Sequence, residues 1–416
     1  MRRLIEALAA NYGYSAFAAL VTLLVVPLYV RLLDGAWGQL ALCLTLQGFL
    51  LLADGALSPL LLRDAARSRD SRASLEYWRF LRWYAAIAIA VVVAGQAALV
   101  LARGTIDPGL SVALRLALVQ YGFQFANGAA IAFLIGRGCQ REANLRLVAF
   151  TATKHAAALS LLVREPTAVA YLAAFATVSA IEFGVNHLRV RGDAGRSRDG
   201  SAAVASEGAP RVAAFVGASA LGLVGGQLDR VVLALTQPAS RYGVYYLAGS
   251  VMLSLLSLQV PALRTFLPLA AAGRRPRSTA ASMLAVLAAT IVAPALAIAL
   301  FAERVLSVWL HDTAIAAEGA PVLRLLMLAL VMNALYAPAG MLLVHAHRYS
   351  TLAVMNAAIV AGECAVLYWL VPDMGILAGA IAWIAGGAIQ LVVAVGVWRG
   401  GIADDPGTRN ARQEPL

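Results

Sequence analysis

A small set of charged side chains lies inside segments that are otherwise apolar, and these are the residues best placed to do chemistry. The basic members are Lys154, Arg115, Arg230, Arg264 and Arg324. The acidic members are Asp54, Glu182, Asp229 and Glu363. A charge at the centre of a lipid bilayer costs about 2.5–3.5 kcal/mol on insertion scales, so each one needs a partner or a water-filled cavity. Lys154, the only lysine in the chain, has the clearest need because it lies in the middle of its segment.

Charges of both signs in one interior predict two roles. The cations can hold an anionic head group such as a phosphate, and the carboxylates can exchange protons or sodium ions to drive a cycle. Two simpler interpretations stay open. Asp229 and Arg230 are neighbours and can neutralise each other, and Arg115, Arg264 and Arg324 lie near segment ends, where long side chains reach the membrane surface.

Uncharged polar residues form stripes at helical spacing within the same segments. We expect the following of them to line a polar cavity: Asn11, Gln120, Gln124, Asn127, Ser250, Ser254 and Ser257. The alternative is that they join helices to one another, because small and hydroxylated residues pack and hydrogen-bond between membrane helices.

These residues belong to a chain whose composition is that of a membrane protein. Of its 416 residues, 61% are hydrophobic and 13% are charged, whereas soluble domains average about 45–50% and about 25%. The N-terminus continues from Arg3 through about 29 mostly apolar residues, which is longer than the apolar region of a signal peptide, about 7–15 residues. We therefore predict an all-α polytopic membrane protein whose first helix is retained.

Twelve segments are long and apolar enough to cross a bilayer, which takes about 20 residues each. Their approximate limits are 5–33, 36–61, 80–102, 108–136, 146–163, 167–190, 212–234, 241–270, 281–302, 318–344, 348–371 and 374–398. Most of the 33 Lys and Arg residues lie at the ends that share a side with the N-terminus. The positive-inside rule then places both termini in the cytoplasm.

The longest hydrophilic stretch divides the chain into two halves. We predict an N-terminal six-helix lobe at 1–190, a cytoplasmic linker at 191–210, a C-terminal six-helix lobe at 211–398 and a cytoplasmic tail at 399–416. Spans recur at an offset of about 205 residues, and transporters place substrate sites at the interface of such repeats, so we expect the lobes to surround a central cavity.

Several functional classes are excluded by what the sequence lacks. No outer loop exceeds about 20 residues, and the chain has no Walker A loop and no nucleophile elbow, so we do not expect an enzyme. Cys43, Cys139 and Cys364 lie far apart in the sequence, and His345 and His347 have no carboxylate or cysteine nearby, so no metal or cofactor is predicted. The net charge of +11 comes from arginines between the spans, which argues against a nucleic-acid partner.

Short motifs along almost the whole chain are similar to one transporter family. They include Pro27-Leu-Tyr-Val-Arg31-Leu-Leu-Asp-Gly35-Ala-Trp-Gly38, Leu52-Ala-Asp54-Gly, Gln227-Leu-Asp229-Arg230 with Tyr242-Gly243-Val-Tyr245, Val305-Leu-Ser-Val-Trp309-Leu, and Pro372-Asp-Met-Gly375-Ile-Leu-Ala-Gly379-Ala. In order and spacing they resemble the Wzx-like oligosaccharide flippases of the multidrug/oligosaccharidyl-lipid/polysaccharide superfamily. Two places depart from the pattern: Asp34 stands where the family usually has glycine, and His345-Ala-His-Arg348 replaces "A-x-G-R".

The resemblance implies two six-helix lobes around a cavity that opens alternately to either side of a bacterial inner membrane. It implies transport of an undecaprenyl-pyrophosphate-linked oligosaccharide to the outer leaflet, for polysaccharide, O-antigen or exopolysaccharide synthesis. Expected partners are this lipid-linked substrate, membrane lipids, a coupling H+ or Na+, a glycan polymerase and glycosyltransferases. With twelve spans the chain departs from the peptidoglycan-precursor flippases of the superfamily, which typically have fourteen.

Two other functions remain as alternatives. A cation-coupled multidrug exporter of the same superfamily would be expected to have an acidic cavity, and Lys154 argues against it. A membrane-embedded glycosyltransferase is disfavoured because outer loops and catalytic residues are missing.

Overall fold

In the computed structural model, helices make up most of the part of the chain that the structure describes, and short turns join them. The described residues are 13, 17, 20, 21, 23–51, 54, 57, 58, 61, 62, 65, 70–194, 209–271, 276–346 and 348–400. Within these ranges there is no strand. Eight helices of the described chain are long and apolar enough to cross a membrane. The prediction of an all-α polytopic membrane protein is confirmed.

The apolar helices coincide with predicted spans. The eight are Leu75–Leu101, Pro108–Gly136, Ala168–Gly192, Ala239–Leu267, Pro276–Leu300, Thr313–His345, Tyr349–Met374 and Ile376–Gly400. The predicted spans 146–163 and 212–234 are also helices but are not among these eight. The remaining two, 5–33 and 36–61, run over residues outside the described part.

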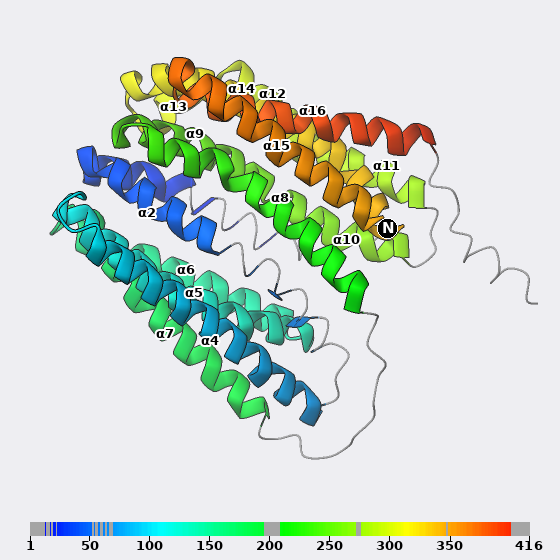
Figure 1. Ribbon diagram of the computed structural model, residues 1–416, viewed down its shortest axis with the longest axis horizontal. Coiled ribbons are helices and arrows are strands. Elements are labelled where there is room, and N and C mark those ends of the chain that lie inside the picture. The colour runs from blue at the N-terminus through cyan, green and yellow to red at the C-terminus, as the bar shows by residue number, and fades with distance from the viewer. Residues whose placement is uncertain are drawn as a thin grey trace, which may run out of the picture. The chain divides into compact units, whose positions relative to one another are not determined.

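Contacts divide the chain into two compact units, which we call unit 1 and unit 2. Unit 2 comprises Leu24–Val212 with Pro238–Gly243, and unit 1 comprises Ala213–Gln237 and Val244–Leu416 with Met1–Leu23. The helices of unit 2 are η1 (Asp34–Ala36), α2 (Trp37–Leu50), α4 (Asp70–Leu101), α5 (Pro108–Gly136), α6 (Gln140–Leu162) and α7 (Ala168–Ala194). Helix α5 packs against both α4 and α7, and α6 packs against α7 (Figure 1).

The helices that lie wholly or mainly in unit 1 are α8 (Ala209–Thr236), α9 (Ala239–Leu256), α10 (Gln259–Ala271), α11 (Pro276–Leu287), α12 (Ala293–Leu300), α13 (Ala302–Leu310), α14 (Thr313–His345), α15 (Tyr349–Met374) and α16 (Ile376–Gly400). Helix α14 contacts α16, α13, α12 and α11, and α16 also contacts α15 (Figure 1).

Two of the predicted spans contain interruptions. The span predicted at 241–270 breaks between α9 and α10, at Ser257 and Leu258. The span predicted at 281–302 passes through a π-helical segment, η2 (Ala288–Val292), between α11 and α12. Such π-helical turns are rare and occur mostly as single turns inside α-helices.

The turn before α2 explains the departure at Asp34. Asp34 has a φ of +43°, the left-handed side of backbone space where glycine is favoured. Aspartate tolerates this region better than most residues because its short polar side chain bonds locally. The residue therefore adopts a glycine-like conformation at the position where the motif usually has glycine.

Aromatic side chains fill the core of unit 2. Tyr77, Tyr84, Tyr121 and Phe125 are fully or almost fully buried between α4 and α5. The outer faces of the helices show the opposite composition, with large apolar side chains exposed, such as Leu101 at 87% and Leu235 at 81%. This is the distribution expected of helices that face lipid, because lipid tails are as apolar as leucine.

Candidate functional site

The mid-span charge of Lys154 is paired within unit 2. Its Nζ lies 2.6 Å from Oε2 of Glu182, and the two side chains are 13% and 4% exposed. The pair joins α6 to α7 in the middle of both helices. The structure therefore gives Lys154 the partner that a charge within the membrane requires.

A chain of hydrogen bonds continues from this pair. Asn127 on α5 donates from Nδ2 to Glu182 Oε1 at 3.0 Å. Asn186 donates from Nδ2 to Asn127 Oδ1 at 2.9 Å and accepts from Arg146 Nη1 at 3.2 Å. Asn127, Asn186 and Glu182 are all buried, so the polar path runs through the interior of the three-helix contact.

The path ends at a cluster of one carboxylate and two guanidinium groups. Arg146 donates from Nε and Nη2 to Glu142 Oε1 at 3.1 and 2.9 Å. Arg189 donates from Nε to Glu142 Oε1 at 2.8 Å and from Nη2 to Oε2 at 3.2 Å. The hydrogen bond from Arg189 is the main reason that the pKa of Glu142 lies below its usual value, and Arg146 lowers that pKa further.

The carboxylate of Asp54 accepts hydrogen bonds from two hydroxyl groups within unit 2, one of them from α4. Ser58 Oγ and Tyr84 OH each donate to Asp54 Oδ1 at 2.6 Å. The carboxylate lies against Gly128 of α5, where a Cβ would come within 2.5 Å of Oδ1. A larger residue at position 128 would have to displace the Asp54 carboxylate.

The glutamine stripe of α5, Gln120 and Gln124, is hydrogen-bonded to the neighbouring helix α2 through Gln120. Gln47 on α2 donates from Nε2 to Gln120 Oε1 at 2.7 Å and to the carbonyl of Ala117 at 3.0 Å. Gln120 in turn donates to Gln124 at a long 3.5 Å. Together with Asn127, these contacts correspond to the interhelical hydrogen bonding that the sequence left open as an alternative.

In unit 1, Asp229 and Arg230 on α8 are both buried. Asp229 is 1% exposed and accepts a hydrogen bond from the hydroxyl of Tyr245 on α9. Arg230 is 5% exposed, and its guanidinium lies over the ring of Tyr246, with Cζ 5.5 Å from the ring centroid. Both residues therefore lie in the interior of unit 1.

Glu363 is the most isolated carboxylate of this set. The residue is 4% exposed, and its Oε2 has no hydrogen-bond partner in the described part of the chain. It lies between two glycines: a Cβ at Gly386 of α16 would be 3.0 Å from Oε1, and a Cβ at Gly225 of α8 would be 3.5 Å from Oε2. Gly225 and Gly386 therefore bring no side chain of their own against the carboxylate.

The serine stripe of α9 bonds to its own backbone. Ser250, Ser254 and Ser257 donate to the carbonyls of Leu247, Ser250 and Ser254 at 2.7, 2.8 and 2.7 Å. Serine hydroxyls in apolar surroundings often satisfy themselves in this way.

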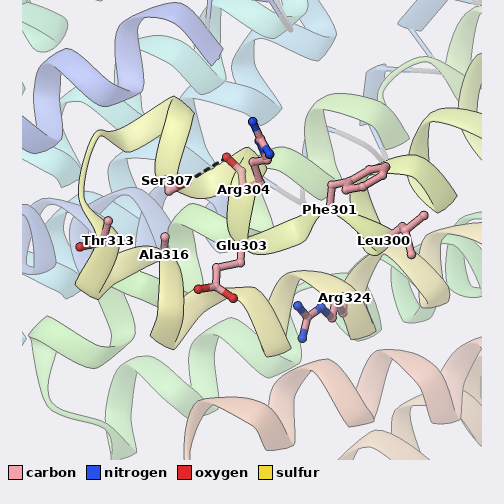
Figure 2. Close-up of a pocket in the computed structure, with 8 residues that line it drawn as sticks. All are labelled: Leu300, Phe301, Glu303, Arg304, Ser307, Thr313, Ala316 and Arg324. Atoms are coloured by element: carbon pink, nitrogen blue, oxygen red, sulfur yellow. Dashed lines mark hydrogen bonds between the residues drawn. The ribbon is translucent and has the colours of Figure 1, made fainter.

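Two other predicted cations lie away from the buried groups. Arg115 donates from Nη1 to Gln96 Oε1 at 3.1 Å, which links α5 to α4. Arg324 is exposed on α14 and lines a pocket of about 390 Å³ with Glu303 and Arg304 of α13. Figure 2 shows Glu303 and Arg324 on one side of α13 and Arg304 on the other. The side chain of Arg264 and the whole of Asn11 lie outside the described residues.

Several partners of these charges were not predicted from the sequence. Tyr84 and Tyr245 donate to Asp54 and Asp229, and Tyr29 shares a hydrogen bond of 2.7 Å with Nδ1 of His155. Tyrosine is common in apolar segments, so only a contact across helices identifies it as a donor. Within the described part of the chain, no group of three or more His, Cys, Asp or Glu residues could hold a metal ion.

Comparisons with known proteins identify the fold. No family model matches the chain, and no curated protein matches its sequence. A structure of the lipid II flippase MurJ in an inward closed conformation is similar, with a TM-score of 0.71 and 10% identity over 93% of this chain and 86% of that chain.

Two further solved structures are similar over nearly their full lengths. The MATE multidrug transporter DinF-BH has a TM-score of 0.68 and 14% identity, over 96% of both chains. A MOP-superfamily transporter from Pyrococcus furiosus, whose binding pocket is described as having reverse polarity, has a TM-score of 0.57 and 15% identity over 94% of this chain and 92% of that chain. These likenesses show the fold, and the Wzx-like assignment drawn from the sequence stays a prediction.

Proposed function

We propose that this protein is a flippase that moves an undecaprenyl-pyrophosphate-linked oligosaccharide from the inner to the outer leaflet of a bacterial cytoplasmic membrane. It would do so by alternating access, with both termini in the cytoplasm. Its fold, shared with MATE transporters and MurJ, supports transport as the general activity. Glycosyltransferases that build the lipid-linked unit and a polymerase that uses it would act before and after it.

The observation that carries the proposal is the pairing of buried cations with carboxylates or aromatic rings. Lys154 is paired with Glu182, and Arg230 lies beside Asp229 and over Tyr246. A pyrophosphate is a stronger partner for a cation than one carboxylate, because it offers more charge and more acceptor oxygens. An arriving head group can therefore draw Lys154 or Arg230 away from its resting partner.

The carboxylates supply the other half of the cycle. When a cation leaves Glu182 or Asp229 for the pyrophosphate, the carboxylate left behind needs a proton or a sodium ion. Glu363, which lacks a hydrogen bond to Oε2 among the described residues, is already placed to take such an ion. Coupling of this kind would make the direction of transport follow the ion gradient.

A cation-coupled multidrug exporter remains the second candidate. The same fold occurs in MATE multidrug transporters, and the buried Glu363 would serve an exporter equally well. The two functions differ in what they need from the cations. A cationic drug would not require Lys154 or Arg230, whereas a pyrophosphate would.

The test is complementation of a strain that lacks the gene. We expect Lys154→Ala and Arg230→Ala, expressed at normal levels, to leave lipid-linked repeat units on the cytoplasmic leaflet. Arg82→Ala is the matched control, because Arg82 is an exposed arginine on α4 outside these contacts. Normal delivery of glycan by both Lys154→Ala and Arg230→Ala would refute the cationic account. Drug resistance on overexpression, with unchanged glycan delivery in the deletion strain, would favour the exporter.

A further inference from the structure

A groove runs along the surface of unit 2 where the turn after α5 meets α6 and α7. It has a volume of about 660 Å³. The residues that line it include Arg141, Glu142, Leu145, Arg146, Phe150 and Val185. Gly138 shapes the turn, since its φ of +80° is a conformation that residues with a Cβ rarely adopt.

The charge of this groove is positive. Glu142 is the one acidic residue among those that line it, and two guanidinium groups, those of Arg146 and Arg189, already bind that carboxylate. Arg141 is exposed beside it. The N-terminal end of α6, which begins at Gln140, adds the partial positive charge of a helix dipole.

The rest of the groove is apolar and open to the surroundings. Leu145 is 59% exposed and Val185 is 42% exposed, with Ala149 and Phe150 next to Leu145 on α6. In a membrane helix such side chains face lipid tails rather than water. The distribution of Lys and Arg places this end of α6 on the cytoplasmic side, where anionic lipids attract clustered basic residues.

We propose that this groove binds an anionic phospholipid of the cytoplasmic leaflet. Its phosphate lies between Arg141 and Arg146, and the first part of an acyl chain lies over Leu145, Phe150 and Val185. A soluble anion would use the arginines but would leave the apolar wall uncovered. A phospholipid satisfies both halves of the groove, and it does so whatever the protein transports.

Binding here has a consequence for the interior of unit 2. Arg146 also donates to Asn186, and Asn186 leads through Asn127 to the Lys154–Glu182 pair. A lipid phosphate that draws Arg146 outward weakens this path at its surface end. Anionic lipid therefore acts on the buried ion pair through hydrogen bonds that already exist.

The experiment measures lipid binding to the purified full-length protein by native mass spectrometry. Phosphatidylglycerol is the probe and phosphatidylcholine is the comparison lipid. We expect the protein to bind phosphatidylglycerol preferentially, and Arg141→Gln/Arg146→Gln to bind it roughly tenfold more weakly, since each basic residue near the surface contributes. Arg82→Gln, an exposed arginine outside the groove, should bind as the unaltered protein does.

The variant Glu142→Gln distinguishes lipid binding by the arginines from a purely structural role of the same arginines. Removal of this carboxylate frees Arg146 and Arg189 from their competitor, so the variant should bind phosphatidylglycerol more tightly. Loss of structure alone would weaken binding in both the arginine and the glutamate variants. Arg141→Gln alone is a variant that should fold normally, because Arg141 is exposed and has no ion-pair partner among the described residues.

Four results would overturn the proposal. The first three are equal binding of the two lipids, unchanged binding by Arg141→Gln and by the double arginine variant, and weaker binding by Glu142→Gln. The fourth is displacement of phosphatidylglycerol by an equimolar polyprenyl pyrophosphate, because the groove would then be a substrate site.

Discussion

Removal of one charge from the Lys154–Glu182 pair should destabilise the protein far more than removal of both. In Lys154→Met, the Glu182 carboxylate keeps, among the described residues, the hydrogen bond from Asn127. In Glu182→Gln, the Lys154 ammonium is left without its ion-pair partner. Breaking a buried ion pair costs about 3–5 kcal/mol, while its replacement by neutral residues is often close to neutral. Glu182 is 4% exposed and Lys154 is 13% exposed, so this pair is largely, although not fully, removed from solvent.

The assay is thermal unfolding of the purified variants in detergent. Unfolding is measured as the loss of the monodisperse protein peak in size-exclusion chromatography after heating. A loss of this size in a unit of this length lowers the unfolding temperature by on the order of 10 °C. We expect that fall for Lys154→Met and for Glu182→Gln, and a recovery of most of it in Lys154→Met/Glu182→Gln. The double variant isolates the interaction of the two charges. If the three variants were equally stable, or if the double variant lost the sum of the single losses, the pair would not have the energetic role assigned to it.

Two further predictions concern unit 2. Because the hydrogen bond from Arg189 lowers the folded-state pKa of Glu142, this group stabilises the fold above its unfolded pKa and loses that contribution as pH falls through the folded pKa. From neutral pH down to values well below 4.5, the usual pKa of a glutamate, the unfolding temperature of Glu142→Gln should thus fall less than that of the unaltered protein, and parallel curves would contradict this. Tyr84→Phe removes a donor to Asp54 and should cost about 1.5–3 kcal/mol, the range for hydrogen bonds to charged groups. Tyr121→Phe is its control, because the Tyr121 hydroxyl has no hydrogen bond in the described chain, and equal thermal stability of the two variants would argue against the Asp54 contact.

The helices were predictable because the membrane imposes their length and composition. Pro108–Gly136 and Ile376–Gly400 lie within a few residues of the spans predicted at 108–136 and 374–398. The breaks were not predictable in the same way. The segments on both sides of Ser257 are both apolar overall, and the residues of the π-helical turn at Ala288–Val292 are as apolar as those of a continuous helix.

By itself, the sequence determined which charges lie inside the spans and that each of them needs a partner, because hydropathy and the cost of a charge in lipid depend only on residue type and position. Only the tertiary structure decided who those partners are. Glu182 lies 28 residues from Lys154 and Asn127 lies 55 residues from Glu182, yet helix packing brings their polar atoms within 3.0 Å. The serines of α9 show the converse, since the same helical spacing that predicted a polar face allows each hydroxyl to bond to its own backbone. A periodic pattern indicates which side of a helix a residue occupies. Whether its polar group then bonds to a neighbouring helix, faces a cavity or bonds to its own backbone depends on what packs against that side.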